Sequence, residues 1–154
     1  MIVDMTPQEC AIAHLLAVMR HSTCRSNNIN DKQMGGQDAI EIDRDGILGE
    51  MAVGKAINRY PDFSIYPRKG GVDLVGANGK KIDVKSTRYK NGKLLVHKDK
   101  SSEEIDVYIL VVIDERTANV VGYIESAEVF KDENLRDLGH GVGYAIEQEK
   151  LRRL

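Results

Sequence analysis

The chain has no tryptophan and only two phenylalanines, so its core has to be built mainly from aliphatic side chains and methionine. It also has only two cysteines, Cys10 and Cys24, which are too few for a disulfide framework. A chain of 154 residues buries enough apolar surface to fold without such cross-links. We therefore predict one globular domain over residues 1–154, with both thiols reduced.

Long apolar runs are missing as well. The longest, Tyr108–Ile113, is much shorter than the roughly 20 residues that a membrane-spanning helix requires. The first residues, Met1–Pro7, lack the basic and apolar stretches of a secretory signal. We expect a protein with no membrane partner and a cytoplasmic location.

The chain has little excess of either charge, with a net charge of −2, but the charge is unevenly distributed. The segment from Lys80 to Lys100 holds eight lysines and arginines against two acidic residues, which makes it +6 and leaves −8 for the remainder. Such a basic strip can supply contacts to the phosphates of a nucleic acid. A solvated, lysine-rich hairpin explains the same charge pattern equally well.

Two helices are predicted from capping signals and periodicity. Thr6-Pro7-Gln8-Glu9 has the form of a capping box with proline at the first helical position, which predicts a helix over about residues 7–21. Residues 22–45, which begin with a stretch rich in serine, asparagine and glycine, are expected to form a loop before the core. An amphipathic pattern then predicts a helix over residues 46–59, ended by Pro61.

The strand pattern is typical of a mixed α/β domain. Ile105–Ile113 is a nearly continuous apolar run, as expected of a central strand that is covered on both faces. Ser126 is expected to cap a short helix that reaches Phe130. Further short strands are predicted at Leu94–His97, Val120–Ile124 and Tyr144–Ile146. Phe63–Tyr66 is either an earlier strand or the first half of one bent strand that continues after Gly70-Gly71.

An asparagine-glycine turn predicts a hairpin between Val72–Val75 and Lys80–Thr87. If Ala77-Asn78-Gly79 forms its loop, Asp73 falls directly opposite Asp83. Directly opposed side chains of an antiparallel pair lie about 5 Å apart. The register therefore predicts two carboxylates that repel each other unless a cation lies between them.

A divalent cation is the natural partner of such a pair. Mg²⁺ is bound by one or two carboxylates, backbone oxygens and water, so the carbonyl of Val84 is a further candidate ligand. Glu50, on the flank of the preceding helix, can complete the cluster and orient an attacking water. Lys85 shares a strand face with Asp83, and its ammonium would stabilise charge that develops on a phosphate. An ordinary hairpin with a solvated Asp and Lys is the alternative interpretation.

Residues on either side of Asp83 and Lys85 are candidates for nucleic-acid binding. Arg88 and Lys90 continue beyond Lys85 and could contact phosphates away from the cut bond, although exposed hairpin residues would look the same. Thr87 could donate a hydrogen bond to a phosphate, or could simply be a strand former. The predicted nucleic-acid-binding residues are Lys81, Thr87, Arg88 and Lys90.

The helix segment Gly46–Ala52, followed by Gly71–Val75 and Ile82–Thr87, resembles the PD-(D/E)XK nuclease superfamily. The resemblance implies a restriction-endonuclease-like core, with a mixed central β-sheet flanked by helices. It also implies a phosphodiesterase that depends on Mg²⁺ or Mn²⁺ and cuts nucleic acid, with DNA favoured over RNA and internal cutting over cutting from an end. Matched residue by residue, the catalytic positions are Glu50, Asp73, Asp83 and Lys85, and the metal ligands are Asp73, Asp83, Glu50 and the Val84 carbonyl.

The chain departs from the family pattern in three places, one of which is the short interval from Asp73 to Asp83, which a tight hairpin accommodates. Val72 stands where the family motif has proline, and a hairpin around residues 115–119 precedes the second helix of the expected αβββαβ order. A catalytically inactive relative that binds nucleic acid or serves in assembly is the alternative. A homodimer is a further expectation, because two copies cut both strands of a duplex more readily than one. Small proteins of this kind occur in bacteriophages, for which the location would be the host cytoplasm.

Glu41, Asp43 and Asp45 form an acidic group just before the predicted second helix. We interpret them as charges at the helix start and on solvated surface. One of them would take the place of Glu50 if the helix register were different.

Overall fold

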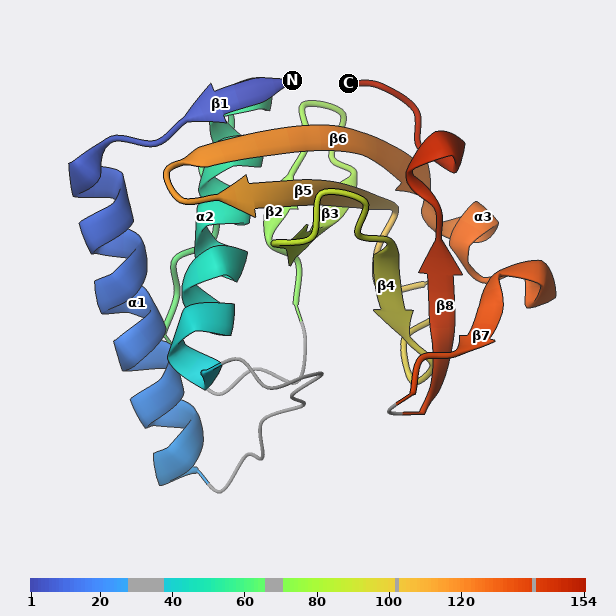
Figure 1. The fold of residues 1–154 in the computed structure, drawn as a ribbon, viewed down its shortest axis with the longest axis horizontal. Coiled ribbons are helices and arrows are strands. Elements are labelled where there is room, and N and C mark those ends of the chain that lie inside the picture. Colours follow the sequence, from blue (N-terminus) through green and yellow to red (C-terminus); the bar gives the residue numbers. More distant parts are fainter. Residues whose placement is uncertain (28–37, 66–70, 102, 140) are drawn as a thin grey trace.

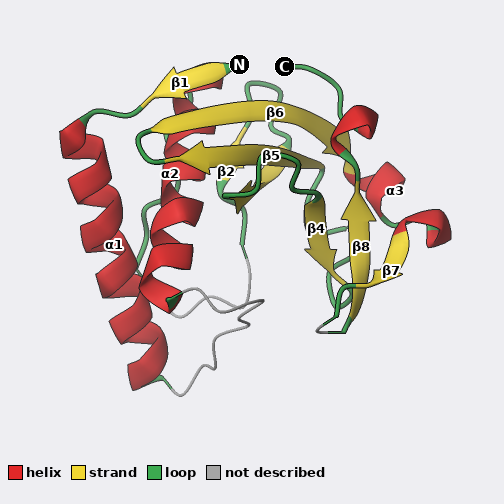
Figure 2. Ribbon diagram, viewed as in Figure 1, coloured by secondary structure: helices red, strands yellow, loops and turns green. Residues whose placement is uncertain are grey.

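Two β-sheets and two long helices make up the molecule in a computed structural model that describes residues 1–27, 38–65, 71–101, 103–139 and 141–154 (Figures 1 and 2). The predicted mixed α/β class is confirmed. Every helix in these ranges is too short or too polar to cross a lipid bilayer. The elements are β1 (Ile2–Asp4), α1 (Pro7–Ser26), α2 (Ala39–Ile57), β2 (Leu74–Val75), β3 (Lys81–Thr87), β4 (Leu94–His97), β5 (Val107–Asp114), β6 (Thr117–Glu125), α3 (Ser126–Val129), β7 (Leu135–Asp137) and β8 (Val142–Ile146), with 3₁₀ turns at Asp132–Asn134 and Gln148–Lys150.

The larger sheet has the strand order β1-β6-β5-β3-β2. Its β3 and β5 strands run parallel, and its other neighbours run antiparallel. In β5 every residue from Val107 to Ile113 is buried and only Asp114 is exposed. The prediction of a central strand covered on both faces is therefore confirmed.

The helices cover one face of this sheet. Alternate residues of β5, among them Ile109 and Val111, pack into the same core as Ile47 and Val53 of α2. Helix α1 lies outside α2, and its buried side chains are the small Ala13 and Ala17, which let the two helices approach closely. The apolar residues of α1 that point away from α2 are partly solvent-exposed: Ile12, Leu15 and Met19.

The smaller sheet, in the order β4-β8-β7, belongs to the second core on the other face of β5 (Figure 2). There Tyr108 and Leu110 pack with Leu94, Val96 and Ile146. The predicted strands at Leu94–His97 and Tyr144–Ile146 are present as β4 and β8. They pair with each other in this second sheet. The long apolar run of β5 is thus explained by two separate cores.

Both ends of the chain are bound to β6, and the two termini lie at the same end of the molecule (Figure 1). Residues Ile2–Asp4 pair antiparallel with Thr117–Asn119. Near the other terminus Tyr123 and Arg152 exchange two backbone hydrogen bonds, of 2.8 and 2.9 Å. Gly122 makes this contact possible, because a Cβ there would lie 2.4 Å from the carbonyl oxygen of Arg152.

The predicted loop over residues 22–45 is wrong at both ends. Helix α1 continues to Ser26 because its polar residues bond to the helix itself: the Thr23 hydroxyl donates to the Met19 carbonyl, and Ser26 to Ser22, both at 2.9 Å. Helix α2 begins at Ala39 rather than at residue 46. Residues 28–37 of the predicted loop lie outside the described part of the chain.

Two further predictions need correction. Ser126 is the first residue of α3 and Glu125 is its N-cap, so Ser126 does not cap this helix, which is only four residues long. Residues 63–65 are not in a strand, and Tyr66 lies outside the described residues. The β5–β6 hairpin turns at Glu115, which has a positive φ of 51°, and it does precede α3 as the apolar pattern indicated.

Candidate functional site

The β2–β3 hairpin has the predicted register. Leu74 pairs with Ile82, and the turn closes through Gly79, whose φ of 78° suits glycine. The backbone N–H of Asp73 donates to the carbonyl of Ile82 at 2.9 Å, which extends the ladder by one residue. Asp73 and Leu74 therefore both lie beside Ile82, and the paired residues end at Leu74, one short of the predicted Asp73–Asp83 pair.

The described residues before Asp73 do not pair with β3, so the edge of β3 at Val84 is open on this side. The side chain of Asp73 contacts this open edge. Its Oδ2 accepts a hydrogen bond of 2.8 Å from the backbone N–H of Val84. In a strand the N–H and C=O of one residue point to the same side. The Val84 carbonyl is therefore directed to the same open edge as the Asp73 carboxylate.

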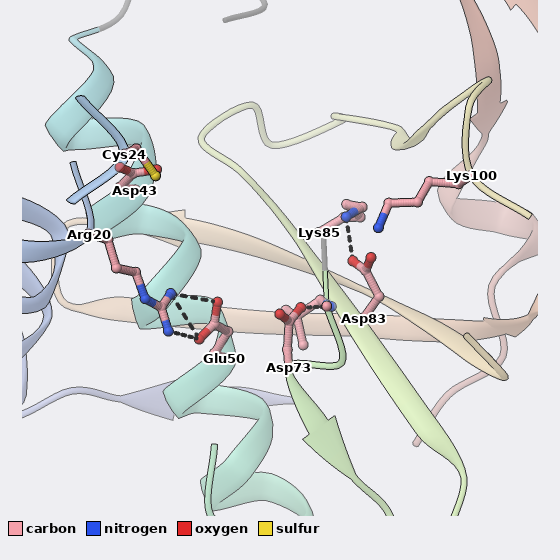
Figure 3. Close-up of a pocket in the computed structure, with 10 residues that line it drawn as sticks. Arg20, Cys24, Asp43, Glu50, Asp73, Asp83, Lys85 and Lys100 are labelled. Carbon is pink, nitrogen blue, oxygen red and sulfur yellow. Dashed lines mark hydrogen bonds and ion pairs between the residues drawn. The ribbon is translucent and has the colours of Figure 1, made fainter. Parts of the chain in front are cut away.

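A pocket of about 350 Å³ opens beside this edge, and we call it the carboxylate pocket (Figure 3). All four predicted catalytic side chains and Val84 lie in its wall. Segments distant in sequence contribute to it, from both long helices to the connection between β4 and β5. Its lining residues are Arg20, Cys24, Asp43, Glu50, Gly71, Asp73, Asp83, Val84, Lys85 and Lys100.

Helix α2 brings Glu50 to the pocket because it packs very closely on β3. A Cβ on Gly49 would lie 2.1 Å from the Ser86 hydroxyl oxygen and 3.4 Å from Val84 Cγ1, so only glycine allows this approach without rearrangement. Glu50, the next residue, is 7% exposed and lines the pocket. The predicted helix register is therefore the one that places Glu50, rather than a neighbouring acid, beside Asp73.

Arg20 of α1 pairs with Glu50 in the pocket wall (Figure 3). Its terminal nitrogens lie 3.2 to 3.4 Å from the two carboxylate oxygens of Glu50, and one of them also donates to the carbonyl of Asp62 at 2.8 Å. The sequence-based reasoning missed this residue. Its spacing is informative in retrospect, since Arg20 lies three residues beyond the buried Ala17 on the stripe of α1 that faces α2.

Asp83 and Lys85 form an ion pair across two residues of β3 (Figure 3). Asp83 is 3% exposed, whereas the Lys85 side chain is 32% exposed and reaches the pocket opening. The predicted common face of the two side chains is thus confirmed. In Figure 3 the ammonium of Lys100, another residue that sequence reasoning did not single out, points at the same pair.

The electrostatics of the pocket are dominated by crowded acids. Burial, together with the charges of Glu50 and Asp83, raises the pKa of Asp73 to about 7, against the opposing effects of the Val84 N–H and Lys85. The Asp73 carboxyl therefore keeps its proton to a much higher pH than an exposed aspartate does. A positive charge between these carboxylates would remove the repulsion.

The donor atoms fit a hard divalent cation in kind, because Asp73, Asp83 and the Val84 carbonyl offer oxygen ligands at one edge. Each carboxylate also has a protein partner: Arg20 for Glu50, Lys85 for Asp83, and the Val84 N–H for Asp73. Over the described ranges, no three His, Cys, Asp or Glu side chains are already arranged around one cation position. Cation binding would require Asp83 to turn from Lys85 toward Asp73.

The residues predicted to bind nucleic acid lie outside the lining of the carboxylate pocket. Lys81 and Lys90 are exposed at the start of β3 and in the turn after it. The Thr87 hydroxyl accepts a hydrogen bond of 3.2 Å from the backbone N–H of Tyr89. Arg88 forms an ion pair with Asp45 of α2, so its guanidinium is directed to the helix.

The acidic group at residues 41–45 lies inside α2, in its first two turns, rather than before it. Asp43 lines the carboxylate pocket, and Asp45 is buried and contacts both Arg44 and Arg88. Glu41 Oε2 lies 3.6 Å from Arg88 Nη1. These acids are therefore mostly paired with arginines, which differs from the expected solvated surface.

No protein-family model matches the chain, and no curated protein matches it in sequence. Inference about its activity therefore rests on the geometry of the carboxylate pocket.

Proposed function

We propose that the chain is a metal-dependent nuclease of the PD-(D/E)XK type that hydrolyses phosphodiester bonds, with DNA as the favoured substrate. The observation that supports this most is the convergence of Glu50, Asp73, Asp83 and Lys85 in one pocket, from α2, from the residue before β2 and from β3. A charged hairpin with no function has no reason to place a helix acid beside two strand acids. Burying such acids together is unfavourable unless a cation compensates.

The arrangement of the elements supports a restriction-endonuclease-like core. Helix α2 packs on a sheet in which the antiparallel β2–β3 hairpin is followed by the parallel, central β5. This order matches the first helix and three strands of that core. The β5–β6 hairpin, the short α3 and the second sheet are then additions particular to this chain.

We infer that Asp73, Asp83 and the Val84 carbonyl would hold Mg²⁺ or Mn²⁺, with Glu50 contributing directly or through water. When bound, such a cation supplies charge neutralisation and activation of a water molecule. The charges of Glu50 and Asp83 that help to raise the pKa of Asp73 are the repulsion that a bound cation would relieve, and the cation would displace the Asp73 proton.

The protein's own residues have distinct tasks in this proposal. Arg20 fixes the orientation of Glu50, whose carboxylate can accept a hydrogen bond from the attacking water. Once Asp83 turns to Asp73, the ammonium of Lys85 is released to contact a phosphate oxygen. Its charge then stabilises the extra negative charge of the transition state.

A second candidate is a catalytically inactive relative that binds nucleic acid. It is favoured by the pairing of Glu50 with Arg20 and of Asp83 with Lys85, because both carboxylates are neutralised by the protein itself. Under this alternative, mutation of the acids would leave binding unchanged, and no metal would be needed.

Incubation of the protein with plasmid, linear duplex, single-stranded DNA and RNA, in Mg²⁺, Mn²⁺ or EDTA, separates the two candidates. We expect cutting that EDTA abolishes and that Asp83→Ala and Lys85→Ala each lower by on the order of 100-fold or more. Asp114→Ala, at the exposed end of β5, is the matched control for loss of an acid. Cutting that survives EDTA or Asp83→Ala would contradict the proposal, while metal-independent binding without cutting would favour the inactive relative.

The predicted homodimer is tested separately by light scattering with and without substrate. A protein that cuts both strands of a duplex is expected to be dimeric on DNA.

A further inference from the structure

A second cavity, of about 550 Å³, adjoins the carboxylate pocket and shares Gly71 and Lys100 with it. The two cavities therefore lie next to each other beside the hairpin, and we call the pair the groove. The residues that line only the second cavity are Val72, Lys81, Ser101, Glu103, Glu104 and Ile105.

Lys100 stands where the two cavities meet. Its backbone N–H donates to the carbonyl of His97 at 3.1 Å, which anchors the connection between β4 and β5. The side chain is 21% exposed, and in Figure 3 its ammonium points toward Asp83 and Lys85. Glu104 is its acidic neighbour, but the Nζ–Oε2 distance is 4.0 Å, longer than a hydrogen bond.

Lys81 extends the same line of positive charge. It lies two and four residues before Asp83 and Lys85, so the three side chains share one face of β3. At about 3.3 Å per residue, Lys81 and Lys85 are roughly 13 Å apart along the strand. Lys81 is exposed, and its backbone N–H donates to Asp106 Oδ2 at 2.7 Å, which fixes the start of the strand beside the second cavity.

We propose that one strand of a nucleic acid follows this groove, with Lys100 contacting the phosphate nearest the carboxylate pocket and Lys81 contacting a phosphate further along. This inference rests on the proposed function and adds Lys100 as a substrate-binding residue. Three ammonium groups, at positions 81, 85 and 100, then lie along a path long enough for more than one phosphate. Glu103 and Glu104 repel phosphates, so they confine the strand to the lysine side of the groove.

The test is equilibrium binding of a short, fluorescein-labelled single-stranded oligonucleotide to the full chain in EDTA, repeated between about 50 and 200 mM salt. A lysine that binds a phosphate contributes to the slope of log affinity against log salt, by roughly 0.7 for a single strand. We expect Lys100→Ala and Lys81→Ala each to make this negative slope shallower by about this amount, and to weaken binding several-fold at the lower salt. Lys100→Arg keeps the charge and should keep the slope.

Lys131→Ala is the charge-matched control, since Lys131 is exposed outside both cavities. The inference is overturned if the Lys100→Ala slope equals that of Lys131→Ala while the unmodified protein binds. If the unmodified protein binds no nucleic acid, the proposed function fails and the inference fails with it. Thermal melts of each variant separate a lost contact from a lost fold.

Discussion

Arg20 contacts both carboxylate oxygens of Glu50, and the same guanidinium reaches the backbone of Asp62. Three segments are joined by this one side chain: α1, α2 and the chain that leads to the hairpin. The Glu50 carboxylate is nearly buried and lies close enough to Asp73 to raise its pKa. Arg20 is therefore what allows an acid to be buried at this position.

Arg20→Ala should destabilise the protein by about 3 kcal/mol, because it leaves Glu50 buried without its cation. Adding Glu50→Gln should restore most of the loss, since the neutral side chain no longer needs a partner. Urea unfolding measures both variants, and Arg153→Ala in the exposed C-terminal tail is the control. Equal destabilisation in the single and double variants would show that Arg20 acts through packing alone.

Stability should depend on pH through Asp73. Its folded pKa is about 7, above the ordinary value of 3.8, so between these pH values the folded protein keeps a proton that the unfolded chain has lost. The contribution of this group to folding therefore falls as pH rises from about 4 to about 7, and is constant outside that window. Asp73→Asn keeps a side-chain oxygen that can accept the hydrogen bond from the Val84 N–H, but it has no proton to lose in this pH range.

The difference in unfolding free energy between Asp73→Asn and the unmodified protein should thus grow across that pH window. Added Mg²⁺ should raise the melting temperature of the unmodified protein more at about pH 8 than at about pH 5, since a cation binds the ionised carboxylates. A pH-independent difference between the two proteins would show that the Asp73 pKa is ordinary.

Gly49→Ala and Gly46→Ala should have opposite effects although both lie in α2. A Cβ on Gly46 meets nothing within 4 Å, so alanine there should stabilise the helix by about 0.5–1 kcal/mol. A Cβ on Gly49 collides with Ser86 and should destabilise by about 1–3 kcal/mol. Ser86→Ala removes the colliding oxygen and should relieve most of that loss in the double variant. Denaturant melts distinguish these outcomes, and a neutral Gly49→Ala would mean that α2 does not approach β3 this closely.

The ion pair between Arg88 and Asp45 should give a coupling free energy of about 1 kcal/mol in a double-mutant cycle of alanine and asparagine replacements. The value is modest because the Arg88 side chain is 35% exposed and Arg44 also contacts Asp45. A phosphate contact by Arg88, which stays a prediction, would appear separately as a reduced salt slope of nucleic-acid binding for Arg88→Ala. Zero coupling would argue that Arg88 is available to the substrate.

The parts of the site that could be predicted are those set by local sequence. An asparagine-glycine turn determines the hairpin register, which brings Asp73 and Asp83 to the same pocket. Strand alternation places Lys85 on the face of Asp83, and helical periodicity places Glu50 toward the sheet. Each of these relations depends on neighbours a few residues apart.

The parts that could not be predicted depend on contacts between distant segments. Arg20 lies 30 residues before Glu50, and nothing near it in the chain indicates an acidic partner. Lys100 reaches the pocket only because β4 belongs to a second sheet, whose partner strand β8 lies near the end of the chain. The end of α1 was misplaced for a local reason, since its serine and threonine hydroxyls bond back to the helix instead of leaving it.

The pairing of Ile2–Asp4 with Thr117–Asn119 has a consequence for how the protein is made. β1 is synthesised more than 100 residues before its partner, so it has nothing to pair with until the first residues of β6 have been synthesised and have left the exit tunnel. The helix pair can form from neighbouring sequence long before that. We therefore expect the outer strand to dock after the helix pair has formed, as the step that completes the larger sheet.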